Sequence, residues 1–439
     1  MQLANRRKFL QKVGVSAAGA AAWAAIAPHS RAAGANERVR VAIFGTGNQG
    51  SGHIASLGSL KDADVAYICD IDEKRLGDQK KNAPNAQAIT DLRRALDDKS
   101  IDAVSIALPD HWHVPAALLA MDAGKHVYVE KPCSHNFREG QLLVTAAKKT
   151  GLTVVHGTQS RSGPAVQEAI AMLREGVIGD VLIARAWNCQ RRDNIGHKHP
   201  SEAPAGVDYD TWVGPAEWMP FQENRFHYTW HWWHNFGTGD IGNDGAHEFD
   251  LALWGLGVET HPTTINAVGG KYYFDDDQEW PDTAQIALEY AGDGKPGNKR
   301  MLIFEQRLWS TNYPQGVDTG VEFTGTKGKM FVSKRGKFEV RGERNALIDR
   351  KLSGVPKGSV VDNHQNFLDA LRGTAKSFTN AEIAHRTAAA AHLGNIAIRV
   401  GRSLTFDPAK ETIVGNEEAT KLLSRKYREG GHWSVPRGV

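Results

Sequence analysis

Residues 39–50 read Val-Arg-Val-Ala-Ile-Phe-Gly-Thr-Gly-Asn-Gln-Gly, a short apolar run that leads into three glycines. These glycines, Gly45, Gly47 and Gly50, follow the pattern G-x-G-x-x-G. Between a strand and a helix, the first glycine permits a tight turn, the second lets a pyrophosphate approach the backbone, and the third lets helix and strand pack closely. The stretch therefore predicts a Rossmann-type dinucleotide site, with Asn48 and Gln49 at the start of the helix.

Strands and helices continue to alternate after this turn. We expect strands at residues 39–44, 64–69, 101–108, 126–129 and 152–156, with helices at residues 49–60, 114–123 and 138–149. Such alternation is typical of βαβ units, so residues 36–158 are predicted to form an α/β domain with a parallel, doubly wound sheet. Asp70 follows the second strand, where a carboxylate binds a ribose 2′-hydroxyl. It favours NAD as cofactor, and the nearby Lys74 and Arg75 leave NADP as the alternative.

The pattern changes after residue 158. Apolar runs with turn-forming residues between them predict strands at residues 181–188, 264–268, 285–290, 301–306 and 329–332. Helical patterns return at residues 363–371 and 381–400. We expect residues 159–439 to form a second domain of the α+β class, with a mostly antiparallel open sheet and with C-terminal helices that pack back on the first domain.

The first 35 residues have the features of a twin-arginine signal peptide. Arg6 and Arg7 precede an Ala-rich apolar run at residues 13–27, which is shorter than the about 20 apolar residues that span a bilayer. We therefore expect export to the periplasm without stable membrane insertion. The leader holds five basic and no acidic residues, and the remaining 48 basic and 50 acidic residues do not predict a nucleic-acid-binding surface.

Two polar segments follow buried strands of the predicted parallel sheet. The first contains Pro109, His111 and His113, and the second contains Glu130 and Lys131. Ligands of open α/β sheets bind at the carboxyl ends of the strands, so these residues are candidates for contact with the cofactor. A cationic nicotinamide ring would favour the neutral, proton-accepting form of Lys131, which makes this lysine a candidate catalytic base.

A Gly-rich segment in the second half provides a candidate proton shuttle. In a continuous helix, Asn243, His247, Asp250 and Trp254 would share one face. Histidine titrates near neutral pH, so we expect His247 to act as a catalytic acid or base.

Together, the glycine turn, the Pro-Asp-His-Trp-His segment, Glu130-Lys131-Pro132 and the segment that contains His247 resemble the glucose–fructose oxidoreductase, inositol dehydrogenase and MocA (Gfo/Idh/MocA) family. The resemblance covers essentially the whole chain after the leader. It implies that Lys131 contacts the reacting hydroxyl and that His247 is the acid/base.

One position departs from the family pattern. The family commonly has Asp four residues before its histidine, whereas this chain has Asn243. An amide orients a substrate hydroxyl but does not stabilise an imidazolium by charge. Two hypotheses follow: either Lys131 carries the proton transfer alone, or Asp244 or Asp250 supplies the missing carboxylate.

Residues 226–234 are unusually aromatic and contain Trp230 and His231. Aromatic faces suit sugar C–H groups, so we expect this run, with Gln159, Arg161, Asp244 and His247, to bind a sugar or cyclitol; interior or interface packing is the alternative for the aromatic rings. The several histidines nearby lack thiolates or a tight carboxylate set, and no metal site is predicted.

Three functions remain open. The first is a dehydrogenase that exchanges a hydride between a sugar, glycoside or cyclitol hydroxyl and a tightly bound cofactor. The second is an NAD-dependent glycosidase or lyase that passes through a transient keto-sugar, although no pair of glycosidase carboxylates is evident. The third is a non-catalytic sugar-binding module. By analogy with such domains, the open sheet predicts a homodimer or homotetramer.

Overall fold

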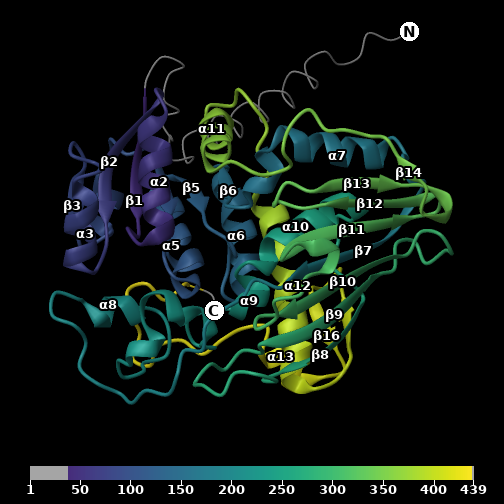
Figure 1. Cartoon of the computed structure of the whole chain (residues 1–439). Coiled ribbons are helices and arrows are strands. Elements are labelled where there is room, and N and C mark those ends of the chain that lie inside the picture. Colours follow the sequence, from purple (N-terminus) through teal and green to yellow (C-terminus); the bar gives the residue numbers. More distant parts are fainter. Residues whose placement is uncertain (1–37, 438–439) are drawn as a thin grey trace, which may run out of the picture.

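The computed structural model describes residues 38–437, so the signal peptide predicted at residues 1–35 lies outside the described residues. Two sheets dominate the molecule and lie side by side in Figure 1, the smaller at the left and the larger at the right. The chain completes the smaller sheet before it enters the larger one.

The first sheet has six strands in the order β3-β2-β1-β4-β5-β6, and every pair is parallel. This arrangement confirms the predicted doubly wound sheet. Its strands are β1 (Val39–Phe44), β2 (Ala63–Cys69), β3 (Gln87–Ile89), β4 (Ala103–Ile106), β5 (His126–Val129) and β6 (Val154–His156). The intervening helices are α2 (Asn48–Ser59), α3 (Glu73–Lys80), α4 (Arg93–Asp97), α5 (Asp110–Asp122) and α6 (Phe137–Thr150).

Side chains of a strand alternate between the two faces of a sheet, and here both faces carry apolar residues. Helices cover both faces and bury these residues. In β1, Val41 and Ile43 share one core with residues of α2 and of α11 (Val360–Leu371). Ala42 and Phe44 face the opposite core, which contains residues of α5, α6 and the first turns of α12 (Ala381–Val400). Helices from the last third of the sequence therefore complete the domain built on the first sheet.

The second sheet has ten strands in the order β14-β13-β12-β11-β7-β10-β9-β8-β15-β16. All its pairs are antiparallel except β7 with β10, which confirms the predicted mostly antiparallel sheet. The strands are β7 (Val181–Asn188), β8 (Thr264–Gly270), β9 (Thr283–Tyr290), β10 (Arg300–Arg307), β11 (Thr319–Gly325), β12 (Gly328–Val332), β13 (Phe338–Arg341), β14 (Leu347–Ile348), β15 (Leu404–Asp407) and β16 (Thr412–Val414).

Helices cover one face of this second sheet and share its core. These are α7 (Pro164–Arg174), α10 (Gly245–Leu256) and α12. The remaining short helices are η1 (Gln159–Ser162), α8 (Tyr209–Val213), η2 (Glu223–Arg225), η3 (His227–Trp232), α9 (Gly239–Gly242), η4 (Pro314–Gly316), η5 (Glu343–Asn345) and α13 (Glu417–Lys421). Within residues 38–437, no helix is both long and apolar enough to cross a membrane.

The helix predicted to carry Asn243, His247, Asp250 and Trp254 on one face is interrupted. Helix α9 ends at Gly242, and Asn243 leaves the helical conformation with φ −71° and ψ −92°. Helix α10 then begins at Gly245, so it carries the other three residues and Asn243 lies outside it. The expectation of one continuous face was wrong for Asn243 because the backbone bends there.

Candidate active site

The glycine turn lies between β1 and α2, where the sheet order reverses between β1 and β4. Gly45 has φ +90°, and a Cβ there would lie 2.3 Å from the carbonyl oxygen of Ala107. A Cβ on Gly50 would lie 2.0 Å from the carbonyl oxygen of Gly45. Each position thus accepts only glycine, for the tight turn and for the packing of α2 against it.

The start of α2 is open to a ligand. Gly47 occupies the N-cap, and no side chain caps the first turn, which Asn48 and Gln49 begin. Backbone N–H groups at such a position, together with the helix dipole, bind phosphate oxygens. The open helix start and the glycine turn therefore fit the pyrophosphate of a dinucleotide.

Asp70 at the end of β2 is bound to the same turn. Its Oδ2 accepts hydrogen bonds from the Thr46 N–H at 2.7 Å and from the Thr46 hydroxyl at 2.9 Å. Its Oδ1 accepts from the Asp72 N–H at 3.0 Å. Asp70 also lines the cavity described next, as does Arg75, so the carboxylate predicted for the ribose is accompanied by a guanidinium.

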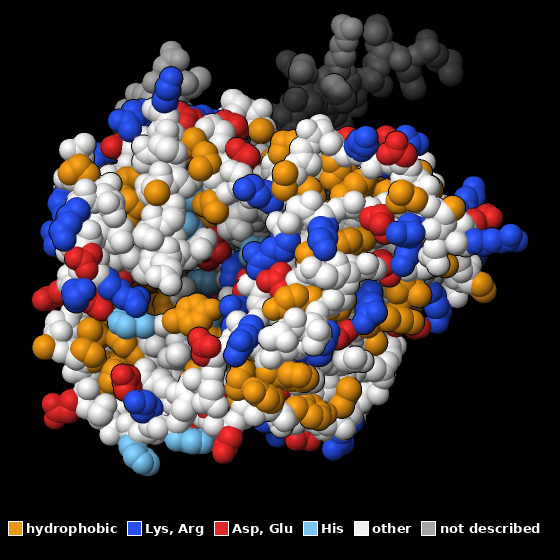
Figure 2. Space-filling view, viewed as in Figure 1, with side chains coloured by type: hydrophobic (Ala, Val, Ile, Leu, Met, Phe, Trp, Pro, Cys, Tyr) orange, Lys and Arg blue, Asp and Glu red, His pale blue; other side chains and the backbone are white. Residues whose placement is uncertain are grey.

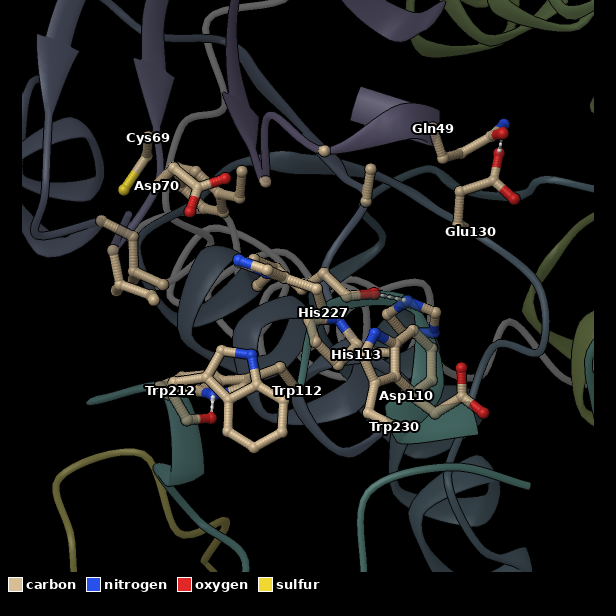
Figure 3. A pocket seen from close by; sticks show the side chains of 18 of the residues that line it. Gln49, Cys69, Asp70, Asp110, Trp112, His113, Glu130, Trp212, His227 and Trp230 are labelled. Carbon is tan, nitrogen blue, oxygen red and sulfur yellow. Dashed lines mark hydrogen bonds between the residues drawn. The ribbon is translucent and has the colours of Figure 1, made fainter. Parts of the chain in front are cut away.

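A cavity of about 430 Å³ joins the glycine turn to the second half of the chain. Figure 2 shows the surface hollowed between the two domains, and in Figure 3 Asp70 lies at one end of the pocket while Gln49 and Glu130 lie at the other. The predicted residues that line the cavity are Gly45, Gly47, Asn48, Gln49, Asp70, Pro109, His113, Glu130, Lys131, Trp230, His231, Asn243 and Asp244. Four predicted residues besides Gly50 lie outside its lining: His111, Gln159, Arg161 and His247.

Glu130 is the buried centre of a hydrogen-bond network below the glycine turn. Its Oε1 accepts from the amides of Gln49 at 2.9 Å and Gln159 at 3.1 Å, and lies 3.0 Å from Nε2 of His53. Burial raises the pKa of Glu130, but the hydrogen bond with His53 and the nearby charges outweigh it and hold the pKa at about 2. Gln159 thus reaches the site through Glu130, and the network fixes the segment that carries Lys131.

Lys131 begins a chain of polar contacts that crosses from one domain to the other. Its Nζ donates to Oδ1 of Asn243 at 2.6 Å, and Nδ2 of Asn243 donates to Oδ1 of Asp240 at 2.8 Å. Asp240 is fully buried and is held by Arg192, whose Nε lies 2.9 Å from Oδ2. The amide therefore orients the ammonium, while Asp240, the carboxylate in this series of contacts, is paired with Arg192.

His247 lies close enough to Lys131 to interact with it electrostatically. Its buried Nδ1 has no hydrogen-bond partner among the described residues. Burial, with Lys334 and Lys131, holds the pKa of His247 well below its usual range, so the imidazole is neutral near pH 7. Neither carboxylate considered for His247 forms a hydrogen bond with its ring: Asp244 pairs with Arg192, and Asp250 accepts from Arg161 at 2.9 Å. Burial raises the pKa of Asp244, but Lys334, Lys131 and Arg192 hold it well below its usual value.

The two histidines of the first polar segment, His111 and His113, contact backbone carbonyl oxygens through their ring nitrogens. The ring nitrogens of His113 lie 2.6 Å from the Pro132 carbonyl oxygen and 2.7 Å from that of Leu108, so His113 joins the loops that follow β4 and β5. His111 is fully buried, with its ring nitrogens 2.8 Å from the Trp212 carbonyl oxygen and 3.3 Å from that of Phe236. His111 therefore fixes the insertion between β7 and α9 and does not face the cavity.

The aromatic run divides between packing and the cavity. Phe226, Trp232 and Trp233 are buried, whereas Trp230 and His231 line the cavity with their rings stacked 3.7 Å apart. Arg161 contacts helix α10, where it pairs with Asp250 and lies 4.9 Å from the ring centroid of Trp254. Its contacts are those of a residue that positions α10.

Several residues of the site carry no sequence signal of their own. Asp240 and Arg192 complete the polar chain from Lys131, and Lys334 lies 3.2 Å from Glu248, which burial gives a pKa of about 7. Asp110 belongs to the segment that begins at Pro109, but its residue type and position predicted no role for it. Burial raises the pKa of Asp110 to about 7, and the Thr238 hydroxyl donates a hydrogen bond to its carboxyl group at 2.7 Å.

The end of the chain also reaches the cavity, which the sequence did not predict. Trp433 lines it beside Trp112, with ring centroids 5.4 Å apart, and Arg93 stacks on Trp433 at 4.5 Å. The preceding segment is anchored by Arg425, which pairs with Glu139 at 2.7 Å.

Comparisons with known proteins agree with this geometry. Residues 39–158 match the family model of the Gfo/Idh/MocA oxidoreductase family, NAD-binding Rossmann fold, and residues 186–435 match that of the oxidoreductase family, C-terminal alpha/beta domain. A glycosyl hydrolase family 109 protein of Shewanella pealeana is 30% identical over 206 residues. The alignment covers 42% of this chain and 45% of that protein, so it spans less than half the length of this relative.

Solved structures with the same fold include two enzymes. The WlbA dehydrogenase of Bordetella pertussis, in complex with NADH and UDP-GlcNAcA, has a TM-score of 0.63 at 19% identity, over 84% of this chain and 99% of that one. The aldose–aldose oxidoreductase of Caulobacter crescentus, complexed with glycerol, has a TM-score of 0.63 at 17% identity, over 84% and 100% of the two chains. The chain belongs to the Gfo/Idh/MocA oxidoreductase family, and residues 39–158 are its NAD-binding Rossmann fold.

Proposed function

We propose that this protein transfers a hydride between a hydroxyl-bearing carbon of a sugar, glycoside or cyclitol and NAD. The observation that carries the proposal is the position of Lys131: its ammonium, oriented by Asn243, lines the same cavity as the glycine turn. The amine that would accept the proton, once it is neutral, and the dinucleotide cradle thus share one cavity.

Bound NAD would supply the hydride acceptor, held by the glycine turn, the start of α2 and Asp70. The residues of this chain then manage the proton that must leave the substrate oxygen. Lys131 is the group we assign to that step. Asn243 holds its Nζ by a hydrogen bond and adds no charge at that contact.

Of the two hypotheses about the missing carboxylate, the contacts of Asp244 and Asp250 favour the one in which Lys131 carries the proton transfer. Asp244 and Asp250 each pair with an arginine, and neither forms a hydrogen bond with the His247 ring. We propose that Lys131 takes the proton from the hydroxyl and that the neutral His247, which interacts electrostatically with Lys131, assists this transfer.

The lining of the cavity supports a polyhydroxylated substrate. Trp230, Tyr228 and His231 provide aromatic rings to the cavity lining, while Asn243 and Asp244 provide polar groups to it. Sugars combine C–H faces with hydroxyls, and both needs are met there.

A second candidate is an NAD-dependent glycosidase or lyase. It is favoured by the relatives of glycosyl hydrolase family 109, whose alignments reach 30% identity over 206 residues. In this chemistry a transient ketone acidifies the neighbouring C–H, the glycosidic bond is eliminated, and the hydride returns to the sugar. Lys131 would serve the oxidation step in both reactions.

The predicted export adds a requirement. Free dinucleotide is scarce outside the cytoplasm, so we propose that the cofactor is bound before export and retained during turnover. Trp433 lines the cavity and packs on Trp112, and we assign it to retention of the cofactor.

The proposal is tested on purified protein by recording nicotinamide absorbance at 340 nm while sugars, cyclitols and glycosides are added. A rise with a ketosugar product indicates the dehydrogenase, and a cleaved glycoside without net reduction indicates the glycosidase. Neither product over a broad panel, with NAD shown to be bound, would overturn both and favour a binding module.

A further inference from the structure

A second cluster of metal-ligand side chains lies away from the cofactor cavity. It consists of His261 in the segment before β8, His385 in α12 and Glu411 in the turn between β15 and β16. One ligand atom from each residue lies within 4.8 Å of the other two. None of the three lines the cavity that holds Lys131.

The distances within the cluster match a metal site of the zinc type. Nε2 of His261 lies 3.2 Å from Oε1 of Glu411, and Nε2 of His385 lies 3.9 Å from Oε2. Ligands of tetrahedral zinc are bound at about 2.0–2.2 Å, which separates neighbouring ligand atoms by roughly 3.3–3.6 Å. Small side-chain rotations would therefore bring all three groups onto one ion.

The two imidazoles are buried and incompletely satisfied. His261 and His385 are only 6% and 4% exposed. Nδ1 of His261 and both ring nitrogens of His385 have no hydrogen-bond partner among the described residues. A simple ion pair of Glu411 with one histidine would account for the first imidazole but leave the second buried without a bond, which is costly. An ion bound by both imidazoles would give each of them a bonding partner.

The surroundings of the cluster resemble the outer shell of a metal site. Nε2 of Gln141 donates to Oε2 of Glu411 at 2.7 Å, which leaves Oε1 directed at His261. Such an outer hydrogen bond orients a ligating carboxylate. Phe137 packs against both imidazoles, with ring centroids 5.4 Å from His261 and 4.8 Å from His385, and provides an apolar wall.

His385 packs closely against a glycine, and Glu411 reaches the solvent. Gly140 faces His385 so closely that a Cβ there would lie 2.2 Å from its Nδ1, so the imidazole occupies this position only because residue 140 lacks a side chain. The Glu411 side chain remains 34% exposed, which gives an ion and a water ligand a route from solvent. Catalytic and accessible zinc sites retain such an open fourth position.

We propose that His261, His385 and Glu411 bind a divalent transition-metal ion, with zinc as the preferred ion and water as the fourth ligand. The ion would connect α12, the segment before β8 and the β15–β16 turn, and through Gln141 it would reach α6 of the Rossmann domain. We assign the ion a structural role, which is to hold the two domains together where these segments meet. It takes no part in hydride transfer.

The test uses the full chain after dialysis against a chelator. Titration with Co²⁺ should produce the intense visible bands of a four-coordinate ion at one equivalent, and Zn²⁺ should bleach them. Zn²⁺ should also raise the melting temperature. Glu411→Gln and His385→Gln should each weaken Co²⁺ binding at least about 100-fold, and Gln141→Leu about 10–100-fold. His199→Gln, which alters an exposed histidine elsewhere, should bind as the original chain does.

Wild-type protein that shows only the weak spectrum of aqueous Co²⁺ would overturn the proposal without reference to any variant. Equal binding by folded His385→Gln and His199→Gln would also overturn it, since the ion would then lie elsewhere. Nicotinamide reduction by sugars is measured separately and does not enter either outcome.

Discussion

Lys131 and Asn243 lie 112 residues apart in the sequence, yet Nζ of the first donates a 2.6 Å hydrogen bond to Oδ1 of the second. Lys131 belongs to the Rossmann domain, and Asn243 lies at the bend before α10. The contact therefore spans the two domains at the cavity. The first two predictions concern the two ends of this hydrogen bond.

Lys131→Met removes the proton acceptor but keeps a side chain of similar length. We expect kcat for sugar oxidation to fall about 10³-fold, within the range usual for loss of a general base, while NAD affinity changes little. Stopped-flow reduction and NAD titration by fluorescence measure the two quantities. Unchanged turnover would remove Lys131 from the proposed role.

Asn243→Ala tests whether the amide positions Lys131. We expect kcat to fall about 10–100-fold with little change in KM or NAD affinity, because the ammonium loses its anchor. Asn243→Asp retains an acceptor oxygen but favours the charged ammonium, so it should restore part of kcat and move the acid limb of the pH–kcat profile to higher pH. Asn235→Ala, at an asparagine bound to the Glu217 carbonyl outside the cavity, is the control. An unmoved pH profile in Asn243→Asp contradicts the assignment.

Gly50→Ala tests the cradle for the cofactor. The added Cβ would lie 2.0 Å from the Gly45 carbonyl oxygen, so α2 must move away from the turn. We expect NAD affinity to fall at least about 100-fold, as measured by calorimetry. Gly52→Ala lies on the same helix with no atom within 4 Å of the new Cβ. It should bind NAD normally and stabilise the protein by about 0.5–1 kcal/mol.

Trp433→Ala tests retention of the cofactor. This change removes the ring that packs on Trp112 and under Arg93 at the cavity. We expect NAD to dissociate about fivefold faster, since an aromatic pair of this kind contributes about 1 kcal/mol. Rapid dilution with fluorescence detection gives the rate. A rate equal to that of the unmodified protein would show that Trp433 does not hold the cofactor.

Asp110→Asn should change how the free energy of unfolding depends on pH. Burial raises the pKa of Asp110 to about 7, above its ordinary value of 3.8. A raised pKa in the folded state means that the carboxyl favours folding below about pH 4 and that this contribution is lost as pH rises through about 7. Asparagine does not titrate and keeps an oxygen to accept from Thr238.

The measurable quantity is the difference in free energy of unfolding between Asp110→Asn and the original chain. It should grow in favour of Asp110→Asn by up to about 4 kcal/mol between about pH 4 and pH 8. Other titrating groups are common to both proteins and cancel in the difference. Urea titrations at several pH values measure it, and a difference independent of pH would show that Asp110 is not buried as an acid.

The sequence by itself determined the Rossmann domain and the class of its ligand. The glycines at 45, 47 and 50 and the apolar strand before them act within one turn and one strand, where local backbone geometry follows from residue type. The same holds for β1 and α12, whose predicted bounds equal the observed ones. Lys131 was identifiable because it follows a buried strand at the end where ligands bind.

Only the tertiary structure decided which side chains meet. The bend at Asn243, the pairing of Asp244 with Arg192, the arrival of Trp433 and the cluster of His261, His385 and Glu411 all depend on contacts between distant segments. Such contacts arise from the packing of two sheets and the helices shared between them, which leaves no periodic signal in the sequence. Periodicity records which face of an element is buried, but the partner of a buried polar group is set by where the next element lies.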